Sequence, residues 1–239
     1  MKVLQLFFIL TIGLFFTSCG EDDVVPPPTV KQIRQIENTK TGHTVFYYYD
    51  SQNRLTEINM PENNTKTVYV YNKTNDTMTI KNYVFPSQEP ASESQGVFQY
   101  GKIKNFDRTN FTYTGEYLMN VTADFYVDSL QYEGNNCIRV AHNANQKSIY
   151  TMEYTDKKDK FNLNFIQQEY SPTLVNKKEM FGKPNDKLVK TITQKSGTTT
   201  INVINYSYVI DSTDYVTKYT RIDGVGPDKD STTYNVNYY

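Results

Sequence analysis

The sequence predicts an all-β protein, built as a large, strongly curved antiparallel meander sheet or a partial barrel. Its 21 Tyr and 13 Phe, with no Trp, favour pleated and half-buried surfaces. The hydrophobic fraction is only 38%, which suits sheets that keep one face in water. Apolar and polar residues alternate with period two, and turn residues interrupt them at short intervals. That pattern is typical of antiparallel meanders.

The first 18 residues have the pattern of a secretory signal peptide. Lys2 precedes an apolar stretch, Val3–Phe16, which is shorter than the ~20 residues of a membrane-spanning helix. Thr17 and Ser18 then lead to Cys19, an arrangement similar to a bacterial lipoprotein signal, although Phe16 stands where an aliphatic residue is usual. We expect cleavage before Cys19 and acylation of its thiol and its new amine with fatty chains such as palmitate. Each buried methylene contributes roughly 0.8 kcal/mol, so several chains would hold the protein to a membrane.

Residues 19–30 are predicted to form a tether. Glu21-Asp22-Asp23 follows the cysteine, and Pro26-Pro27-Pro28 makes the next stretch extended and semi-rigid. Acidic residues at this place are similar to the signal by which some Gram-negative bacteria send lipoproteins to the outer face of the outer membrane. We therefore expect an outer-membrane protein that faces outward. The alternative is that these acids only solvate the tether.

The mature chain, 239 − 18 = 221 residues, is long enough for one large β domain over residues 31–239. Loss of Lys2 leaves 25 − 1 = 24 basic against 26 acidic residues, a formal net charge of −2. Such a balance creates no strong field, so nucleic acid is not expected as a partner. We expect a monomer.

Alternation and turn residues set the expected elements. Residues 117–128 alternate over twelve positions, which predicts one strand of roughly 40 Å. Ser87–Gly96 is expected to be a polar loop, and Phe161–Asn185 a non-sheet excursion. Turns are predicted at Asp50–Asn53, Asn63-Asn64, Asn72–Asp76, Glu133–Asn136, Ser196-Gly197 and Asp223-Gly224.

A strand–turn–strand unit recurs along the chain. In each copy an aromatic residue ends one strand, a polar or glycine turn follows, and an aliphatic residue begins the next strand. A hairpin of this kind cannot bury its apolar face alone and must stack on its neighbours. The copies include Tyr47–Ile58, Phe98–Ile103, Tyr113–Leu118 and Tyr132–Ile138.

The first copy has the spacing Tyr-x-Tyr-Asp-x-x-Asn-Arg-Leu-x-x-Ile over Tyr47–Ile58 and resembles a tyrosine–aspartate (YD, or Rhs-type) repeat. With the lipoprotein signal, Tyr150–Lys158 and Tyr234–Tyr239, about residues 30–239 resemble a family of bacterial lipoproteins of unknown function with a porin-like fold. Asp159-Lys160-Phe161 departs from the Asn-Pro that is more usual there. The resemblance implies a barrel-like hairpin architecture and supplies no catalytic residues. A membrane barrel also needs an apolar outer band on nearly every strand, whereas Asn, Thr, Asp and Lys occupy the faces opposite the core, so we do not expect a pore.

The residues that could carry chemistry are few. His43 and His142 lie outside metal-binding spacings such as H-E-x-x-H, and we expect both at the surface or at strand ends. A lone Cys137 is expected to be a small buried apolar residue. Asp124 and Asp128 are predicted to share one strand face, with Glu133 nearby. Two such acids could serve a glycosidase, but solvated acids are the commoner case. We expect no catalytic residues, no metal and no cofactor.

Four tyrosines are the candidate binding residues: Tyr47, Tyr49, Tyr69 and Tyr71. Tyrosine combines a flat apolar face with a hydroxyl and suits contacts with glycans or proteins. The alternative is that the four are cross-strand partners that hold the sheet together.

The sequence therefore favours a lipid-anchored, non-enzymatic surface protein that binds or scaffolds a glycan, another envelope protein or a host molecule. A second hypothesis is a carrier that holds an apolar ligand in the concavity of a half-open barrel. An envelope hydrolase is the third, and a cleft with a paired acid and histidine would favour it.

Overall fold

The computed structural model describes residues 31–72, 76–99, 102–144, 147–160, 185–227 and 229–239. The chain divides into Met1–Lys31 and Gln32–Tyr239, and the second unit holds the fold. The predicted signal peptide, Cys19 and the tether lie outside the described residues. So does nearly all of the expected excursion over Phe161–Asn185.

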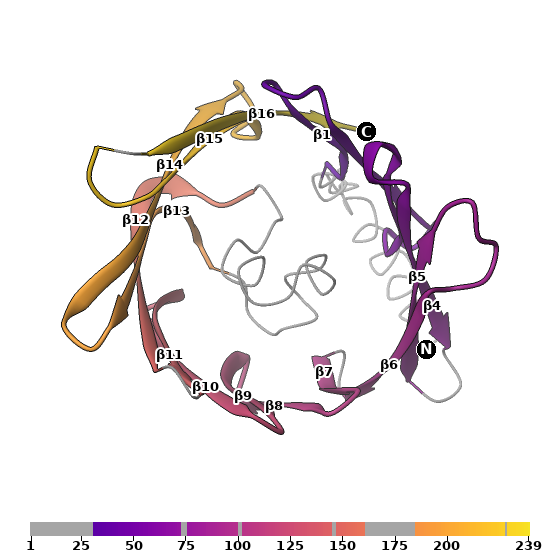
Figure 1. Ribbon diagram of the computed structural model, residues 1–239, viewed down its shortest axis with the longest axis horizontal. Helices are drawn as coiled ribbons and strands as arrows, with labels where there is room; N and C mark the ends of the chain where they lie inside the picture. Colours follow the sequence, from indigo (N-terminus) through magenta and orange to yellow (C-terminus); the bar gives the residue numbers. More distant parts are fainter. Residues whose placement is uncertain (1–30, 73–75, 100–101, 145–146, 161–184, 228) are drawn as a thin grey trace, which may run out of the picture. The chain divides into compact units, whose positions relative to one another are not determined.

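The described residues of the second unit form sixteen antiparallel strands in one closed barrel. Figure 1 shows the strands following one another around the ring in chain order, with β16 beside β1. A short 3₁₀ turn, Pro61–Asn63, joins β3 to β4. The strands are β1 Ile33–Asn38, β2 Thr44–Tyr49, β3 Leu55–Met60, β4 Thr65–Asn72, β5 Thr77–Val84, β6 Ser92–Gln99, β7 Lys102–Phe106, β8 Thr109–Thr114, β9 Tyr117–Ala123, β10 Tyr126–Glu133, β11 Asn136–Asn143, β12 Ser148–Lys158, β13 Lys187–Ser196, β14 Thr199–Ile210, β15 Val216–Asp223 and β16 Asp230–Tyr238.

Closure of the barrel corrects part of the prediction. The all-β antiparallel meander is confirmed, but the sheet is neither open nor partial. β1 pairs with β16, with Ile36 opposite Val236 and Asn38 opposite Tyr234. Because the first and last strands are hydrogen-bonded to each other, no strand is left as an exposed edge.

The single strand predicted over residues 117–128 is wrong. The chain turns at Asp124-Phe125, and β9 and β10 pair with Ala123 opposite Tyr126. The two-residue turn puts Ala123 and Tyr126 on the same face, so the apolar alternation that continues in the sequence to Val127 changes face at the turn. Asp124-Phe125 also lacks the Gly or Asn that usually marks such a turn.

The predicted turns are confirmed where the structure describes them, while residues 73–75 of the turn predicted over Asn72–Asp76 lie outside the described residues. The turn at Asp50 shares its geometry with the β14–β15 turn at Asp211, which was not predicted. In the β2–β3 turn, a carboxylate oxygen of Asp50 accepts hydrogen bonds from the N–H groups two and four residues on, both at 2.9 Å. Asp211 does the same in the β14–β15 turn, at 2.8 and 3.0 Å. Asn53 and Asp214, three residues after each aspartate, take φ of 58° and 65°, a region that Asn and Asp tolerate. The aspartate of the hairpin unit therefore fixes the turn.

Closure gives every strand an inner and an outer face. Met78, Ile80 and Leu55 are at most 1% exposed, which a convex outer surface cannot provide, so the buried face is the inner one. The alternate residues face outward and are largely polar. Outward ion pairs join Lys66 to Glu57 at 3.7 Å and Lys81 to Glu93 at 3.3 Å.

The two ends of the barrel differ in their inner lining. β1 begins and β16 ends at the same end of the barrel, which we call the entry end; the other is the far end. One residue near the start of each odd-numbered strand is at most 4% exposed, and together these form an apolar belt at the entry end. The belt consists of Ile33, Leu55, Met78, Ile103, Leu118, Cys137, Val189 and Val216.

A second belt lies beside the first. Each even-numbered strand places one half-buried aromatic residue near its end, against the core. This aromatic belt consists of Tyr49, Tyr71, Phe98, Tyr113, Tyr132, Tyr154, Tyr208 and Tyr238. The repeated unit of the sequence, an aromatic before a turn and an aliphatic after it, thus supplies one residue to each belt.

Hydrogen bonds join the two belts at regular positions. The hydroxyl of a belt tyrosine donates to the backbone carbonyl of the apolar-belt residue on the preceding strand, and burial raises the pKa of each of these tyrosines, which keeps the hydroxyl protonated. Five such bonds each close one hairpin at its open end. They are Tyr71 to Leu55 (2.9 Å), Tyr113 to Ile103 (2.9 Å), Tyr154 to Cys137 (2.5 Å), Tyr208 to Val189 (2.6 Å) and Tyr238 to Val216 (2.9 Å).

We predict that Tyr113→Phe and Tyr208→Phe each lower the free energy of unfolding by about 1–2 kcal/mol, because a half-buried carbonyl loses its donor. Chemical denaturation would measure the change. Tyr48→Phe is the matched control, since Tyr48 faces outward and is 42% exposed; it should change stability by less than about 0.5 kcal/mol. Equal losses at all three positions would contradict the role given to the belt.

Candidate functional site

Beyond the belts, the inner wall first carries further buried apolar residues, among them Ile58, Ile80, Met152 and Ile192, and polar side chains lie among and beyond them towards the far end. Two sets of polar side chains lie there in register across neighbouring strands. The shorter set crosses β4–β6, where Thr67 donates to Asn82 at 2.8 Å and Asn82 donates to Ser92 at 3.0 Å. The longer set crosses β10–β14 and adjoins a pocket, so we take it as the candidate site.

This longer set, called the polar row below, follows the pairing register of the strands. Asp128 on β10 lies opposite His142 on β11, which lies opposite Ser148 on β12. The next inward-facing residue of β12 after Ser148, towards the entry end, is Tyr150. It lies opposite Gln194 on β13, which lies opposite Asn202 on β14. The polar row comprises Asp128, His142, Ser148, Tyr150, Gln194 and Asn202.

An acid–histidine pair occupies one end of the polar row. Asp128 Oδ1 lies 2.5 Å from His142 Nδ1, and the Asp128 side chain is only 5% exposed. Burial raises the pKa of the Asp128 carboxyl, and the hydrogen bond with His142 offsets this only in part. The ring of Tyr126 packs against the imidazole with centroids 5.4 Å apart. A carboxylate is thus held within an otherwise weakly polar wall by a single histidine.

The middle of the polar row is tied together by one carboxamide. Gln194 Nε2 donates to the Tyr150 hydroxyl at 2.7 Å and lies 3.5 Å from Ser148 Oγ. Ser148, Asp128 and His142 are the residue types of a nucleophilic triad. However, among the described contacts the hydroxyl of Ser148 accepts from Gln194, and no hydrogen bond joins it to His142. In the described contacts, Ser148 is thus tied to the carboxamide of Gln194.

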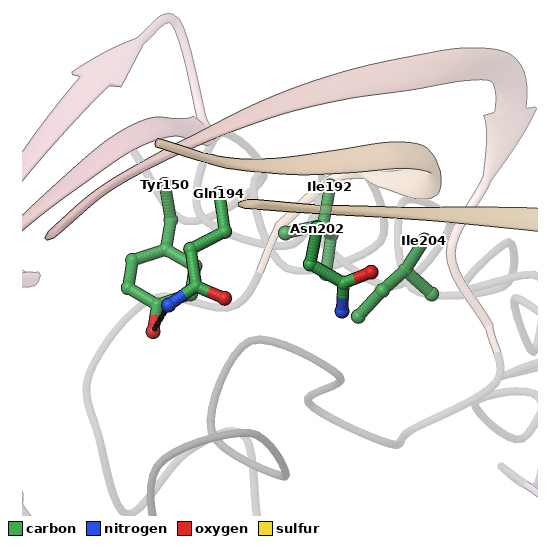
Figure 2. A pocket seen from close by; sticks show the side chains of 5 residues that line it. All are labelled: Tyr150, Ile192, Gln194, Asn202 and Ile204. Carbon is green, nitrogen blue, oxygen red and sulfur yellow. Dashed lines mark hydrogen bonds between the residues drawn. The ribbon is translucent and has the colours of Figure 1, made fainter. Parts of the chain in front are cut away.

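A small pocket lies at the other end of the polar row. Figure 2 shows its five lining side chains on the same side of the sheet. Its volume is about 40 Å³, enough for one small chemical group. The backbone N–H of Val203 donates to Asn202 Oδ1 at 2.8 Å, which fixes the orientation of that carboxamide. The lining residues are Tyr150, Ile192, Gln194, Asn202 and Ile204.

The four tyrosines predicted to bind all lie on the inner face of β2 and β4. Tyr47 and Tyr69 are buried, with exposures of 7% and 5%, while Tyr49 and Tyr71 are half-buried in the aromatic belt. Their location favours the alternative reading, in which they hold the sheet together. Their role in binding stays a prediction.

The other candidates divide between surface and inner wall. His43 is exposed in the β1–β2 turn, as expected. Asp124 lies in the β9–β10 turn beside Arg108, at 3.3 Å, so the shared strand face predicted for Asp124 and Asp128 is wrong. Glu133 is exposed near the entry end. Asp128 is buried rather than solvated, because the turn places it on the inner face.

Cys137 is confirmed as a buried apolar residue. It is 3% exposed and takes the place in the apolar belt that aliphatic residues take on other strands. Burial raises the pKa of its thiol to about 12, so at neutral pH it stays protonated and poorly nucleophilic.

Sequence reasoning missed Ser148, Gln194 and Asn202 as site residues. No motif links them, because they lie on three different strands and meet only through the pairing register. His142 and Asp128 were singled out separately, but their 14-residue separation gave no sign that they pair. The signal that could have identified these residues is a run of inward-facing polar residues on consecutive strands. Recognising that run requires the pairing register of the strands, which the sequence alone does not give.

Comparison with solved structures shows the same barrel fold. The chain is similar to the crystal structure of a porin-like protein from Bacteroides uniformis, with a TM-score of 0.66 and 14% identity over 87% of this chain and 98% of that one. A porin-like protein from Bacteroides vulgatus aligns over the same shares with a TM-score of 0.44 and 12% identity. No family description and no curated protein matches the chain. The porin-like fold is thus confirmed, and at these identities the likeness reaches no further than the fold.

The described residues also bear on metal binding and on helices that span a membrane. No group of three or more His, Cys, Asp or Glu side chains there is placed to hold a metal ion. Within the same part of the chain, no helix has the length and apolarity required to cross a bilayer.

We predict that Asp128→Asn becomes more stable relative to the wild type as the pH rises from 4 to 7. Because the folded pKa of Asp128 lies above its ordinary value of 3.8, its contribution to stability is complete below that value and is lost as the pH rises through the folded pKa. Asparagine has no such loss. Unfolding free energies of both proteins at several pH values would measure the difference, and a constant or opposite trend would contradict the burial argument.

Proposed function

We propose that this protein is a lipid-anchored, non-enzymatic binding protein of the outer-membrane surface. Its barrel stands in water, and it binds a glycan on its inner wall at the polar row. The polar row is the observation that carries the proposal. The anchor, the surface location and the ligand are parts of the same proposal, and each has its own support.

The support for a lipid anchor is the N-terminal sequence. A short apolar segment followed by Thr17, Ser18 and Cys19 is similar to lipoprotein signals, and Glu21-Asp22-Asp23 to a surface-export signal. The tether then continues into β1, which starts at the entry end of the barrel. Acyl chains on Cys19 would hold the N-terminal part of the chain at the membrane and leave the far end of the barrel accessible.

The outer wall supports a barrel in water. Charged side chains face outward on strands around the ring, among them Lys81, Glu93, Glu153 and Lys218. A charged side chain facing lipid at mid-bilayer costs roughly 2–4 kcal/mol. An outer wall with several of them is therefore suited to solvent.

The anchor can be tested separately from the wall. With a protease site inserted between Asp23 and Pro28, cleavage of washed outer membranes should release the barrel into the supernatant without detergent. Uncut membranes should retain it, and palmitate fed to the cells should label the full chain. A barrel that stays with the membrane after complete cleavage would show that its wall is embedded in lipid.

The side chains of the polar row suit a hydroxyl-rich ligand. A carboxylate, an imidazole, a hydroxyl and two carboxamides together provide both donors and acceptors, and the phenol rings of Tyr126 and Tyr150 provide flat apolar faces. Sugars present both hydroxyls and apolar ring faces. A glycan chain would also reach an inner wall more readily than a folded protein. The pairing of Asp128 with His142 is what a hydrolase could use, but the adjoining pocket is lined by carboxamide, isoleucine and tyrosine side chains, which favours binding.

We predict that detergent-purified full-length protein binds glycans on an array, and that the double variant Asp128→Val/His142→Leu loses this binding at least tenfold. Replacing both partners leaves no unpaired buried charge, so the variant should fold. Ser129→Val is the control, because it alters the outward face of the same strand. An array on which nothing binds the wild type, or equal binding by the double variant, would refute a glycan site at the polar row.

A carrier of an apolar ligand is the second candidate, and the apolar belt favours it. However, the belt side chains pack against one another and are at most 4% exposed, which leaves little of their surface for a ligand. An apolar fluorescent dye that binds the protein and is displaced by a fatty acid, but not by sugars, would favour the carrier.

A further inference from the structure

The pocket at the end of the polar row indicates which kind of glycan would bind there. We infer, building on the proposed function, that the ligand is an N-acetylated amino sugar and that its acetamido group enters this pocket. The inference rests on the polar atoms, the apolar walls, the size and the charge of the pocket.

The two carboxamides of the pocket present one acceptor and one donor. Gln194 uses its Nε2 for Tyr150 and Ser148, so the atom it presents is the acceptor Oε1. Asn202 uses its Oδ1 for the N–H of Val203, so it presents the donor Nδ2. Figure 2 shows these two amide groups as neighbours on one side of the sheet.

A secondary amide is the complement of this pair. Its N–H would donate to Gln194 Oε1, and its carbonyl would accept from Asn202 Nδ2. A hydroxyl could use either atom, but it offers no fixed pair of donor and acceptor separated as in an amide. The pocket is therefore better matched to an acetamido group than to the hydroxyl of a simple hexose.

The walls and the volume fit the rest of the group. Ile192 and Ile204 line the pocket beside the carboxamides, and the small part of each that stays exposed, 3%, would face the acetyl methyl. About 40 Å³ is too small for a sugar ring. The ring would therefore lie outside the pocket, along the polar row towards Ser148 and His142, with only its substituent inserted.

The charge around the pocket favours a neutral substituent. Among the described residues, the five that line the pocket include no Lys, Arg, Asp or Glu. Arg221, on the inner face of β15, is held by both carboxylate oxygens of Asp223 at 2.6 and 3.0 Å. A free amine would have to place its ammonium against Ile192 and Ile204 without a counter-ion, which is unfavourable.

Calorimetric titration of the full-length protein with methyl glycosides would test the inference. The probes are the N-acetylglucosamine and N-acetylgalactosamine glycosides, with glucose, galactose and glucosamine glycosides as partners that lack the acetyl group. We expect at least one N-acetylated sugar to bind about tenfold or more tightly than its partners, as two added hydrogen bonds imply. Tight binding of hexose and N-acetylated sugar alike would overturn the inference and leave the proposed function standing. If no sugar binds, both fail.

A matched pair of variants locates the effect. Asn202→Asp keeps the shape of the side chain but replaces the donor by an acceptor, so the preference for the N-acetylated sugar should fall to that of the parent hexose. Asn205→Asp makes the same change on the outward face of β14 and should keep the preference. An unchanged preference in Asn202→Asp would overturn the placement in this pocket. If Asn202→Asp does not fold, the comparison of sugars on the wild-type protein decides alone.

Discussion

The hydrogen bond from a belt tyrosine to the carbonyl of an apolar-belt residue is the interaction on which the barrel depends. It joins an aromatic-belt tyrosine near the end of one strand to the apolar-belt residue near the start of the preceding strand, as between Tyr154 and Cys137. The five bonds that the structure shows each close one hairpin, and eight hairpins side by side close the ring. The barrel is thus built from contacts between strands that are neighbours in the sequence. The pairing of β1 with β16, the first and last strands, is the long-range contact that closes it.

The same constraint sets where function can lie. Because the tyrosines turn inward to reach carbonyls, much of the apolar and aromatic surface of the chain is buried on the inner wall, in the two belts and beside them. What remains for a ligand is the polar part of the inner wall, and what remains for the surroundings is an outer wall with ion pairs such as Lys66–Glu57. The likeness to porin-like proteins is a likeness of fold, and under the proposal made above the polar outer wall faces water.

The sequence was sufficient for the local structure and insufficient for the register. Alternation and turn residues predicted the meander, and the hairpin repeat anticipated both belts. The polar loop predicted over Ser87–Gly96 is wrong for Ser92–Gly96, which belongs to β6. This stretch is polar and contains Gly96, where a Cβ would lie 3.1 Å from Phe106. Closure could not be predicted, since no local pattern marks Ile36 and Val236 as partners. The polar row was missed for the same reason.

The central claim is that polar side chains on the outer wall face water while the inner wall carries the buried belts. Spin labels placed one at a time at Thr151, Ser207 and Lys218, all outward-facing, would test it most directly in native outer membranes. The account predicts that a water-soluble relaxing agent collides with all three labels far more than molecular oxygen does. Strong oxygen collisions with exclusion of the water-soluble agent would place the wall in lipid and contradict it.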